Sequence, residues 1–135
     1  MRIIIDTNRI MAVLIKDSMS RAILFNNDFE FFTPEHAVNE IIKYKKELCK
    51  KAGINEKDFS VVFYFIMEKI KIVPKSEFES FISESKKLIQ DESDVPFIAL
   101  CLHLKANGVW SHDKHFMNQK KVKIFMTSDM INLAR

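Results

Sequence analysis

Short apolar runs alternate with longer amphipathic stretches along this chain. Such a run, rich in β-branched or aromatic residues and closed by polar residues, predicts a buried strand. The expected strands are residues 2–5, 30–32, 71–73, 109–110 and 123–126. Because strands separated by helices favour parallel pairing with right-handed crossovers, the pattern predicts an α/β fold around a parallel sheet of about five strands.

Helical spacing of apolar residues fills the segments between these strands. The expected helices are residues 10–15, 22–25, 34–51, 55–70, 76–90, 95–107 and 128–133. Thr33 and Ser128 are expected to cap helices, and Gly53 and Gly108 to follow helix ends. The stretches 61–67 and 95–104 are apolar nearly all round, so each is expected to lie in the core or against a partner.

Composition places the chain among globular proteins. It has 135 residues, 47% of them hydrophobic and 29% charged, with two Gly and three Pro, which predicts a single folded domain spanning residues 1–135. Cys49 and Cys101 lack metal-ligand spacing and are expected to be reduced core residues. The longest apolar run, 61–67, is too short for a membrane span, so a cytoplasmic protein without a membrane partner is expected.

The net charge of +3 is small, but the lysines are clustered. Residues 43–51 and 105–123 each carry five lysines, near two acidic residues discussed below. Such segments are either solvated faces or a track for a phosphate backbone. The candidates for RNA-backbone contacts are Arg9, Lys43, Lys45, Lys46 and Lys114.

Four carboxylates stand where the predicted fold brings them together. Asp6 and Asp113 follow strands, and the carboxyl ends of parallel strands border the functional crevice of such sheets. Asp94 begins an apolar helix, and Glu40 lies on the shoulder of a buried helical stripe. Clustered acids raise one another's pKa unless a cation lies between them, so a divalent-metal site is predicted.

Each acid also has a purely structural interpretation. Asp94, or Ser93 beside it, fits a helix cap, and Asp6 and Asp113 fit ordinary turns after strands. Glu40 fits a side chain that reaches solvent from the edge of the buried stripe. Four independent coincidences of this kind are less probable than one shared site.

Four sequence blocks, taken in order, resemble the PIN domain family. They are residues 3–8 (IIIDTN), 38–41 (VNEI), 91–100 (DESDVPFIAL) and 109–116 (VWSHDKHF). The resemblance spans essentially the whole chain, and its most specific parts are the last two blocks.

The resemblance implies a three-layer α/β/α fold whose four acids bind Mg²⁺ or Mn²⁺ and cut RNA. By this likeness Asp6, Glu40, Asp94 and Asp113 are the catalytic and metal-binding residues, and Asn8 and Ser111 position water or substrate. An ion so held would lower the pKa of a bound water that attacks the phosphodiester, leaving 5′-phosphate and 3′-hydroxyl ends. Many relatives are homodimeric toxins, so a homodimer and an antitoxin protein are expected partners besides RNA.

Two positions depart from the family pattern. His115 stands where toxin relatives often carry another acid, two residues after Asp113, and Val95 stands where an extra acid is frequent. Asp91 is a candidate for a peripheral carboxylate, and His115 is a second peripheral candidate. One well-held metal is therefore expected.

Three other interpretations remain at this point. His112 and His115 suggest zinc, although no further Cys or His nearby completes a tetrahedral site. Asp6 resembles the nucleophile of phosphotransfer domains, but Thr7 and Asn8 occupy the places of their second acid. A noncatalytic PIN-like module that binds RNA or protein, with residues 61–67 as its main interface, is the third.

Overall fold

The computed structural model describes residues 1–134 and contains a single all-parallel sheet. The strands are β1 (Arg2–Ile5), β2 (Glu30–Pro34), β3 (Ile70–Val73), β4 (Gly108–Trp110) and β5 (Ile124–Phe125). Their order across the sheet is β3-β2-β1-β4-β5. The predicted parallel sheet of about five strands is confirmed.

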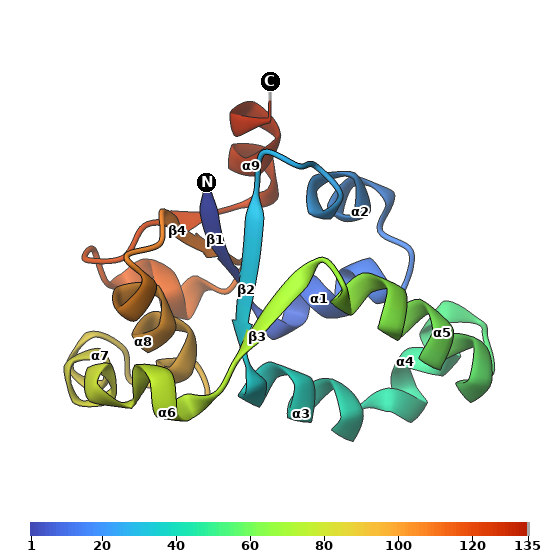
Figure 1. The fold of residues 1–135 in the computed structure, drawn as a ribbon, viewed down its shortest axis with the longest axis horizontal. Helices are drawn as coiled ribbons and strands as arrows, with labels where there is room; N and C mark the ends of the chain where they lie inside the picture. The colour runs from blue at the N-terminus through green and yellow to red at the C-terminus, as the bar shows by residue number, and fades with distance from the viewer. Residues whose placement is uncertain (135) are drawn as a thin grey trace.

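Helices cover both faces of the sheet. They are α1 (Thr7–Leu14), α2 (Ser18–Leu24), α3 (Glu35–Lys43), α4 (Lys45–Ala52), α5 (Glu56–Met67), α6 (Lys75–Phe78), α7 (Ile82–Leu88), α8 (Val95–Leu104) and α9 (Thr127–Leu133), with 3₁₀ turns η1 (Glu79–Phe81) and η2 (Lys114–Asn118). Figure 1 shows α6, α7 and α8 on one side of the sheet and α1, α3, α4 and α5 on the other. This is the expected α/β/α architecture.

The sheet reverses its direction of growth beside β1. From β1 the chain adds β2 and then β3 on one side, and the crossover through α6–α8 returns it to place β4 on the other side of β1. In open parallel sheets the crevice at such a reversal, beyond the carboxyl ends of the strands, is where ligands bind. Ile5 pairs with Trp110, and the Asp6 amide donates to the Trp110 carbonyl over 3.3 Å, so Asp6 and Ser111 leave the sheet side by side.

The core is built on the strands and on α8. Residues 3–5 of β1 are fully buried, and α8 buries nearly every residue from Val95 to Cys101, as its apolar sequence predicts. Trp110 is also fully buried, and its indole Nε1 donates to Thr127 Oγ1 over 3.1 Å. Cys49 and Cys101 are buried and form no disulfide within residues 1–134, as expected.

The single helix expected over residues 34–51 is wrong. The chain forms α3 and α4 instead, and Tyr44 between them has φ −100° and ψ 15°, outside helical geometry. Pro34 ends strand β2, and Thr33 is buried in that strand, where its hydroxyl donates to the Ile5 carbonyl over 2.9 Å instead of capping a helix. Strand pairing between β1 and β2 therefore overrides the local capping signal.

Other helix ends also differ from the prediction. The expected helix at 76–90 is divided into α6, η1 and α7. Helix α8 ends at Leu104, and its C-cap residue Lys105 adopts the left-handed conformation with φ 50°. Gly108 belongs to β4. Gly108 is needed there because a Cβ would lie 2.5 Å from the Lys123 carbonyl oxygen.

At the last helix the expected cap is also wrong. Helix α9 begins at Thr127, and the Asp129 carboxylate accepts the Met126 amide over 2.8 Å, so Ser128 lies inside the helix. Asn55 caps α5, since its side chain accepts the Asp58 amide over 2.8 Å. Gly53 ends α4 in the left-handed conformation, as predicted. Among residues 1–134, none of the helices is long and apolar enough to cross a membrane.

Candidate metal-binding site

A small cavity of about 140 Å³ lies beyond the carboxyl ends of β1 and β4. Segments far apart in the sequence line it: the start of α1, the middle of α3, the start of α8 and the turn around η2. Its lining residues are Asp6, Thr7, Asn8, Glu40, Asp91, Ser93, Asp94, Phe97, Asp113, His115 and Phe116. All four predicted acids therefore border one cavity, together with Asn8 and both peripheral candidates.

Asp6 is held rigidly at the floor of the cavity. It caps α1, and its Oδ1 accepts the Arg9 amide over 2.8 Å. Its other oxygen, Oδ2, accepts the hydroxyl of Ser111. Burial nevertheless raises the Asp6 pKa to about 6, because these hydrogen bonds only partly offset the loss of water around the charge.

Ser111 links two of the acids without lining the cavity. It is fully buried, its hydroxyl donates to Asp6, and the same oxygen accepts the Asp113 amide over 2.9 Å. Ser111 was expected to position water or substrate. Its contacts place it instead behind Asp6, where it fixes the orientation of that carboxylate relative to the Asp113 backbone.

Asp94 is buried and poorly satisfied. It occupies the N-cap position of α8, yet its side chain makes no capping hydrogen bond in the part of the chain that the structure describes. Its Oδ2 is buried and has no hydrogen-bond partner among residues 1–134. Burial, followed by the charges of Asp113 and Asp91, raises the Asp94 pKa to about 7. A helix cap alone does not account for this side chain.

Glu40 is held from two sides on α3. The Thr7 hydroxyl donates to Glu40 Oε1 over 2.7 Å, and His36, one turn earlier on the same helix, brings its Nε2 to 3.3 Å from that oxygen. The Glu40 side chain is 31% exposed. Thr7 is therefore the hydrogen-bond partner of the Glu40 carboxylate, although nothing in the sequence pattern marks Thr7 as a site residue.

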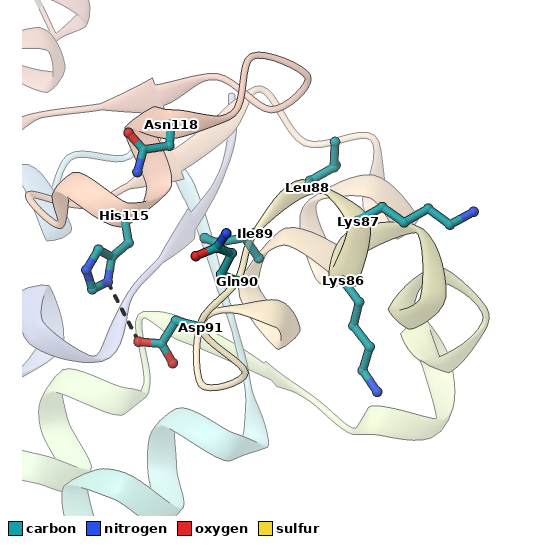
Figure 2. A pocket seen from close by; sticks show the side chains of 8 residues that line it. All are labelled: Lys86, Lys87, Leu88, Ile89, Gln90, Asp91, His115 and Asn118. Carbon is teal, nitrogen blue, oxygen red and sulfur yellow. Dashed lines mark ion pairs between the residues drawn. The ribbon is translucent and has the colours of Figure 1, made fainter.

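Asp91, Asp113 and His115 form the outer rim of the cavity. Asp113 caps η2, because its Oδ1 accepts the His115 amide over 2.9 Å. Asp91 Oδ1 accepts both the hydroxyl and the amide of Ser93, which lowers the Asp91 pKa. Figure 2 shows the His115 imidazole and the Asp91 carboxylate facing each other across the gap between η2 and the loop after α7.

The residues of this cavity fit a hard divalent cation. Several carboxylates share a space of about 140 Å³, one buried oxygen lacks a partner among residues 1–134, and the pKa values of Asp6 and Asp94 are raised by burial. A cation would stabilise the ionised forms of these groups, and Mg²⁺ and Mn²⁺ prefer such oxygen ligands. Asp6, Glu40, Asp94 and Asp113 all line this cavity, whereas the donor atoms that lie within 4.8 Å of one another come from Asp91, Asp94 and His115.

His112 differs from His115 in the direction of its ring. His112 points away from the acids, because its Nε2 accepts the Thr127 amide over 3.1 Å and lies 2.6 Å from the Thr127 hydroxyl. Burial lowers the His112 pKa, consistent with a neutral ring whose Nε2 accepts the amide proton. A zinc site that uses His112 together with His115 is therefore not formed.

The five candidates for RNA-backbone contacts do not line the acidic cavity. Lys45 lines an apolar groove of about 200 Å³ between α3 and α5. Arg9 borders Asp6 through its amide, whereas the exposed Lys43 and Lys46 do not line the acidic cavity. Lys114 is exposed and directly follows Asp113.

A larger cavity of about 540 Å³ adjoins the acidic one and shares Asp91 and His115 with it. It is lined by Lys86, Lys87, Leu88, Ile89, Gln90 and Asn118 in addition to these two residues (Figure 2). The sequence pattern does not single out Lys86 and Lys87. Their only signal is a polar Lys-Lys pair on a helix that ends just before Asp91.

Comparison with known proteins identifies the family. The PIN domain family model matches residues 4–129. A crystal structure of VapBC2 from Rickettsia felis, bound to a DNA fragment from their promoter, is similar in fold, with a TM-score of 0.64 and 12% sequence identity over 93% of this chain and 98% of that chain. No curated protein sequence matches the chain. Since the matched region covers nearly all of the sequence, this chain belongs to the PIN domain family.

Proposed function

We propose that this protein is a divalent-metal-dependent endoribonuclease that hydrolyses RNA phosphodiester bonds. PIN domains are typically nucleases, which supports the reaction class. The observation that carries the proposal is the shared cavity of Asp6, Glu40, Asp94 and Asp113, in which a buried Asp94 oxygen lacks a partner among the described residues.

The chain's own residues supply the binding geometry. A bound Mg²⁺ or Mn²⁺ would provide a more acidic water and neutralise charge on the phosphate. Asp6 and Asp94 would hold that ion from the buried side of the cavity, with Asp6 fixed by the Arg9 amide and the Ser111 hydroxyl. Asp113 would hold it from the rim. Asn8, which is exposed at the cavity mouth, would donate to a phosphate oxygen or a water.

Glu40 is the candidate general base. Its Oε1 accepts the Thr7 hydroxyl, which orients the carboxylate and leaves Oε2 to take a proton from the attacking water. At 31% exposure, the Glu40 side chain is the most accessible of the four predicted acids. The proton that Glu40 takes up can then pass to solvent through His36, whose Nε2 lies 3.3 Å from Glu40 Oε1.

The substrate path is proposed to run through the larger neighbouring cavity. Lys86 and Lys87 on its wall would pair with phosphates, and Gln90 and Asn118 would offer amide groups to the sugar or bases. The two cavities meet at Asp91 and His115, so an RNA strand bound in the larger cavity would lie next to the acids.

The test is a cleavage assay on a pool of RNAs with Mg²⁺, Mn²⁺ or chelator. Asp94→Asn should abolish divalent-dependent cleavage, while Glu68→Gln, which alters an exposed carboxylate outside the cavity, should cleave like the wild type. Equal cleavage by wild type and Asp94→Asn, or cleavage that survives the chelator, would contradict the proposal.

The alternative is a PIN-like module that binds RNA or protein without cutting. Isothermal titration with Mn²⁺ separates the two cases, because a scaffold without metal affinity has no use for buried, mutually repelling acids. Heat of binding that disappears in Asp94→Asn favours the nuclease, and its absence in the wild type favours the module.

A protein partner is proposed to cover the outer face of α5. Val61, Tyr64 and Phe65 there are 66%, 74% and 59% exposed. Exposed apolar groups that gather in this way commonly mark protein interfaces. We propose that this chain is the toxin of a toxin–antitoxin pair, either homodimeric or bound to an antitoxin; its likeness in fold to VapBC2 supports the proposal.

Light scattering on the purified chain, with and without the product of any small reading frame directly upstream, tests this interface. Tyr64→Ser should lower the mass of whichever complex forms. A chain that is monomeric alone and does not bind the upstream product would contradict the assignment as a toxin.

A further inference from the structure

The imidazole of His115 lies among three carboxylates without hydrogen-bonding to any of them. Its Nδ1 is 3.7 Å from Asp91 Oδ2, 3.8 Å from Asp94 Oδ2 and 3.5 Å from Asp113 Oδ1. The backbone amide of His115 donates to Asp113, which fixes the turn and directs the ring toward the acids. Figure 2 shows the ring directed at Asp91.

These separations suit ligands of one cation better than a direct ion pair. Donor and acceptor atoms in a charged hydrogen bond lie about 2.7–3.2 Å apart. Two atoms that bind the same ion, each about 2.0–2.2 Å from it, lie roughly 3 to 4 Å apart. Single donor atoms from Asp91, Asp94 and His115 all lie within 4.8 Å of one another.

Asp94 provides independent support for a ligand at this point. Only 7% of Asp94 is exposed, and the oxygen nearest the ring, Oδ2, is the buried atom that lacks a hydrogen-bond partner among the described residues. An unsatisfied buried carboxylate oxygen is costly. An ion between this oxygen and His115 Nδ1 would satisfy both groups.

We propose that His115 is a nitrogen ligand to a metal ion held with Asp91 and Asp94, so that the site prefers Mn²⁺ to Mg²⁺. Imidazole nitrogen binds first-row transition ions well, whereas Mg²⁺ takes oxygen ligands almost exclusively. The acid that toxin relatives often carry at this position would give an all-oxygen site. This inference rests on the proposed metal site and adds the nitrogen ligand and the ion preference.

The experiment is Mn²⁺ binding to the full chain without RNA, followed by pulsed electron paramagnetic resonance and by calorimetry. The wild type should show coupling of Mn²⁺ to a ¹⁴N nucleus, and His115→Ala should remove it. His115→Ala should weaken Mn²⁺ binding about tenfold or more and Mg²⁺ binding much less. His115→Asp should bind both ions but lose the nitrogen coupling and shift the preference toward Mg²⁺.

The matched control is His103→Ala, which removes a histidine that packs against Phe81 away from the cavity. It should retain the coupling. Bound Mn²⁺ without ¹⁴N coupling in the wild type, an unchanged ratio of Mn²⁺ to Mg²⁺ affinity in His115→Ala, or no Mn²⁺ binding at all would overturn the inference. A chain that binds Mn²⁺ through nitrogen but fails to cut RNA would instead overturn the proposed nuclease activity alone.

Discussion

Replacing Asp6 by Asn should stabilise the metal-free protein while removing its activity. Asp6 is 4% exposed, and burial raises its pKa from 3.8 to about 6. A group whose folded-state pKa is raised binds more protons when folded, so stability falls as pH rises from the unfolded pKa through the folded one. Above pH 6 the full penalty of the buried charge is present in the wild type.

The size of the effect follows from the pKa shift. The rise of the Asp6 pKa from 3.8 to about 6 lowers the free energy of unfolding of the wild type by about 3 kcal/mol near pH 7.5. At pH 5 the loss is about half of that, because pH 5 lies only about halfway between the unfolded and the folded pKa. Asn at position 6 keeps an oxygen that accepts the Arg9 amide, but its NH₂ group faces Ser111. The Ser111 hydroxyl therefore loses its acceptor, which costs about 1 kcal/mol of stability. The expected net gain is about 2 kcal/mol near pH 7.5.

The assay is chemical denaturation of wild type and Asp6→Asn in chelator at pH 5 and pH 7.5. The advantage of the variant should grow by about 1.4 kcal/mol between the two pH values, a difference that does not depend on the Ser111 hydrogen bond. Saturating Mn²⁺ should then stabilise the wild type and leave the variant nearly unchanged. A variant that is less stable at pH 7.5 than at pH 5, relative to wild type, would refute the account of Asp6 as a desolvated charge.

Two further predictions concern substrate binding and folding. Replacing Lys86 and Lys87 by Ala should weaken RNA binding without changing which bond is cut. The slope of log K for RNA binding against log salt concentration should become shallower by about the two phosphate contacts that these lysines make. Replacing Lys45, which lines the groove between α3 and α5, together with Lys46 should change RNA binding less. The reverse ranking would support the phosphate-backbone track that the sequence predicts around Lys45 and Lys46. Gly108→Ala should destabilise the fold by about 1–3 kcal/mol, because the new Cβ meets a carbonyl oxygen 2.5 Å away; unchanged thermal unfolding would contradict this.

Sequence patterns predicted the elements better than their ends. The apolar runs located all five strands, because a short apolar run closed by polar residues leaves few alternatives to a strand, and this holds even for β3, whose Lys71 and Ile72 are exposed. Capping signals failed where tertiary contacts compete for the same group. Thr33 looks like a helix cap, but its hydroxyl instead donates to the Ile5 carbonyl and so joins β2 to β1. Ser128 also looks like a cap, but the Asp129 carboxylate accepts the Met126 amide at the start of α9.

The chain by itself determined which acids follow strands and which begin helices, because position relative to an apolar run is a local property. It could not determine that Thr7 orients Glu40, that Ser111 stands behind Asp6, or that His115 turns its Nδ1 toward Asp94. Those contacts join residues far apart in sequence, or depend on how a turn directs a ring. The reversal of the sheet beside β1 decides them, since it brings the ends of β1 and β4 and the start of α8 to one cavity.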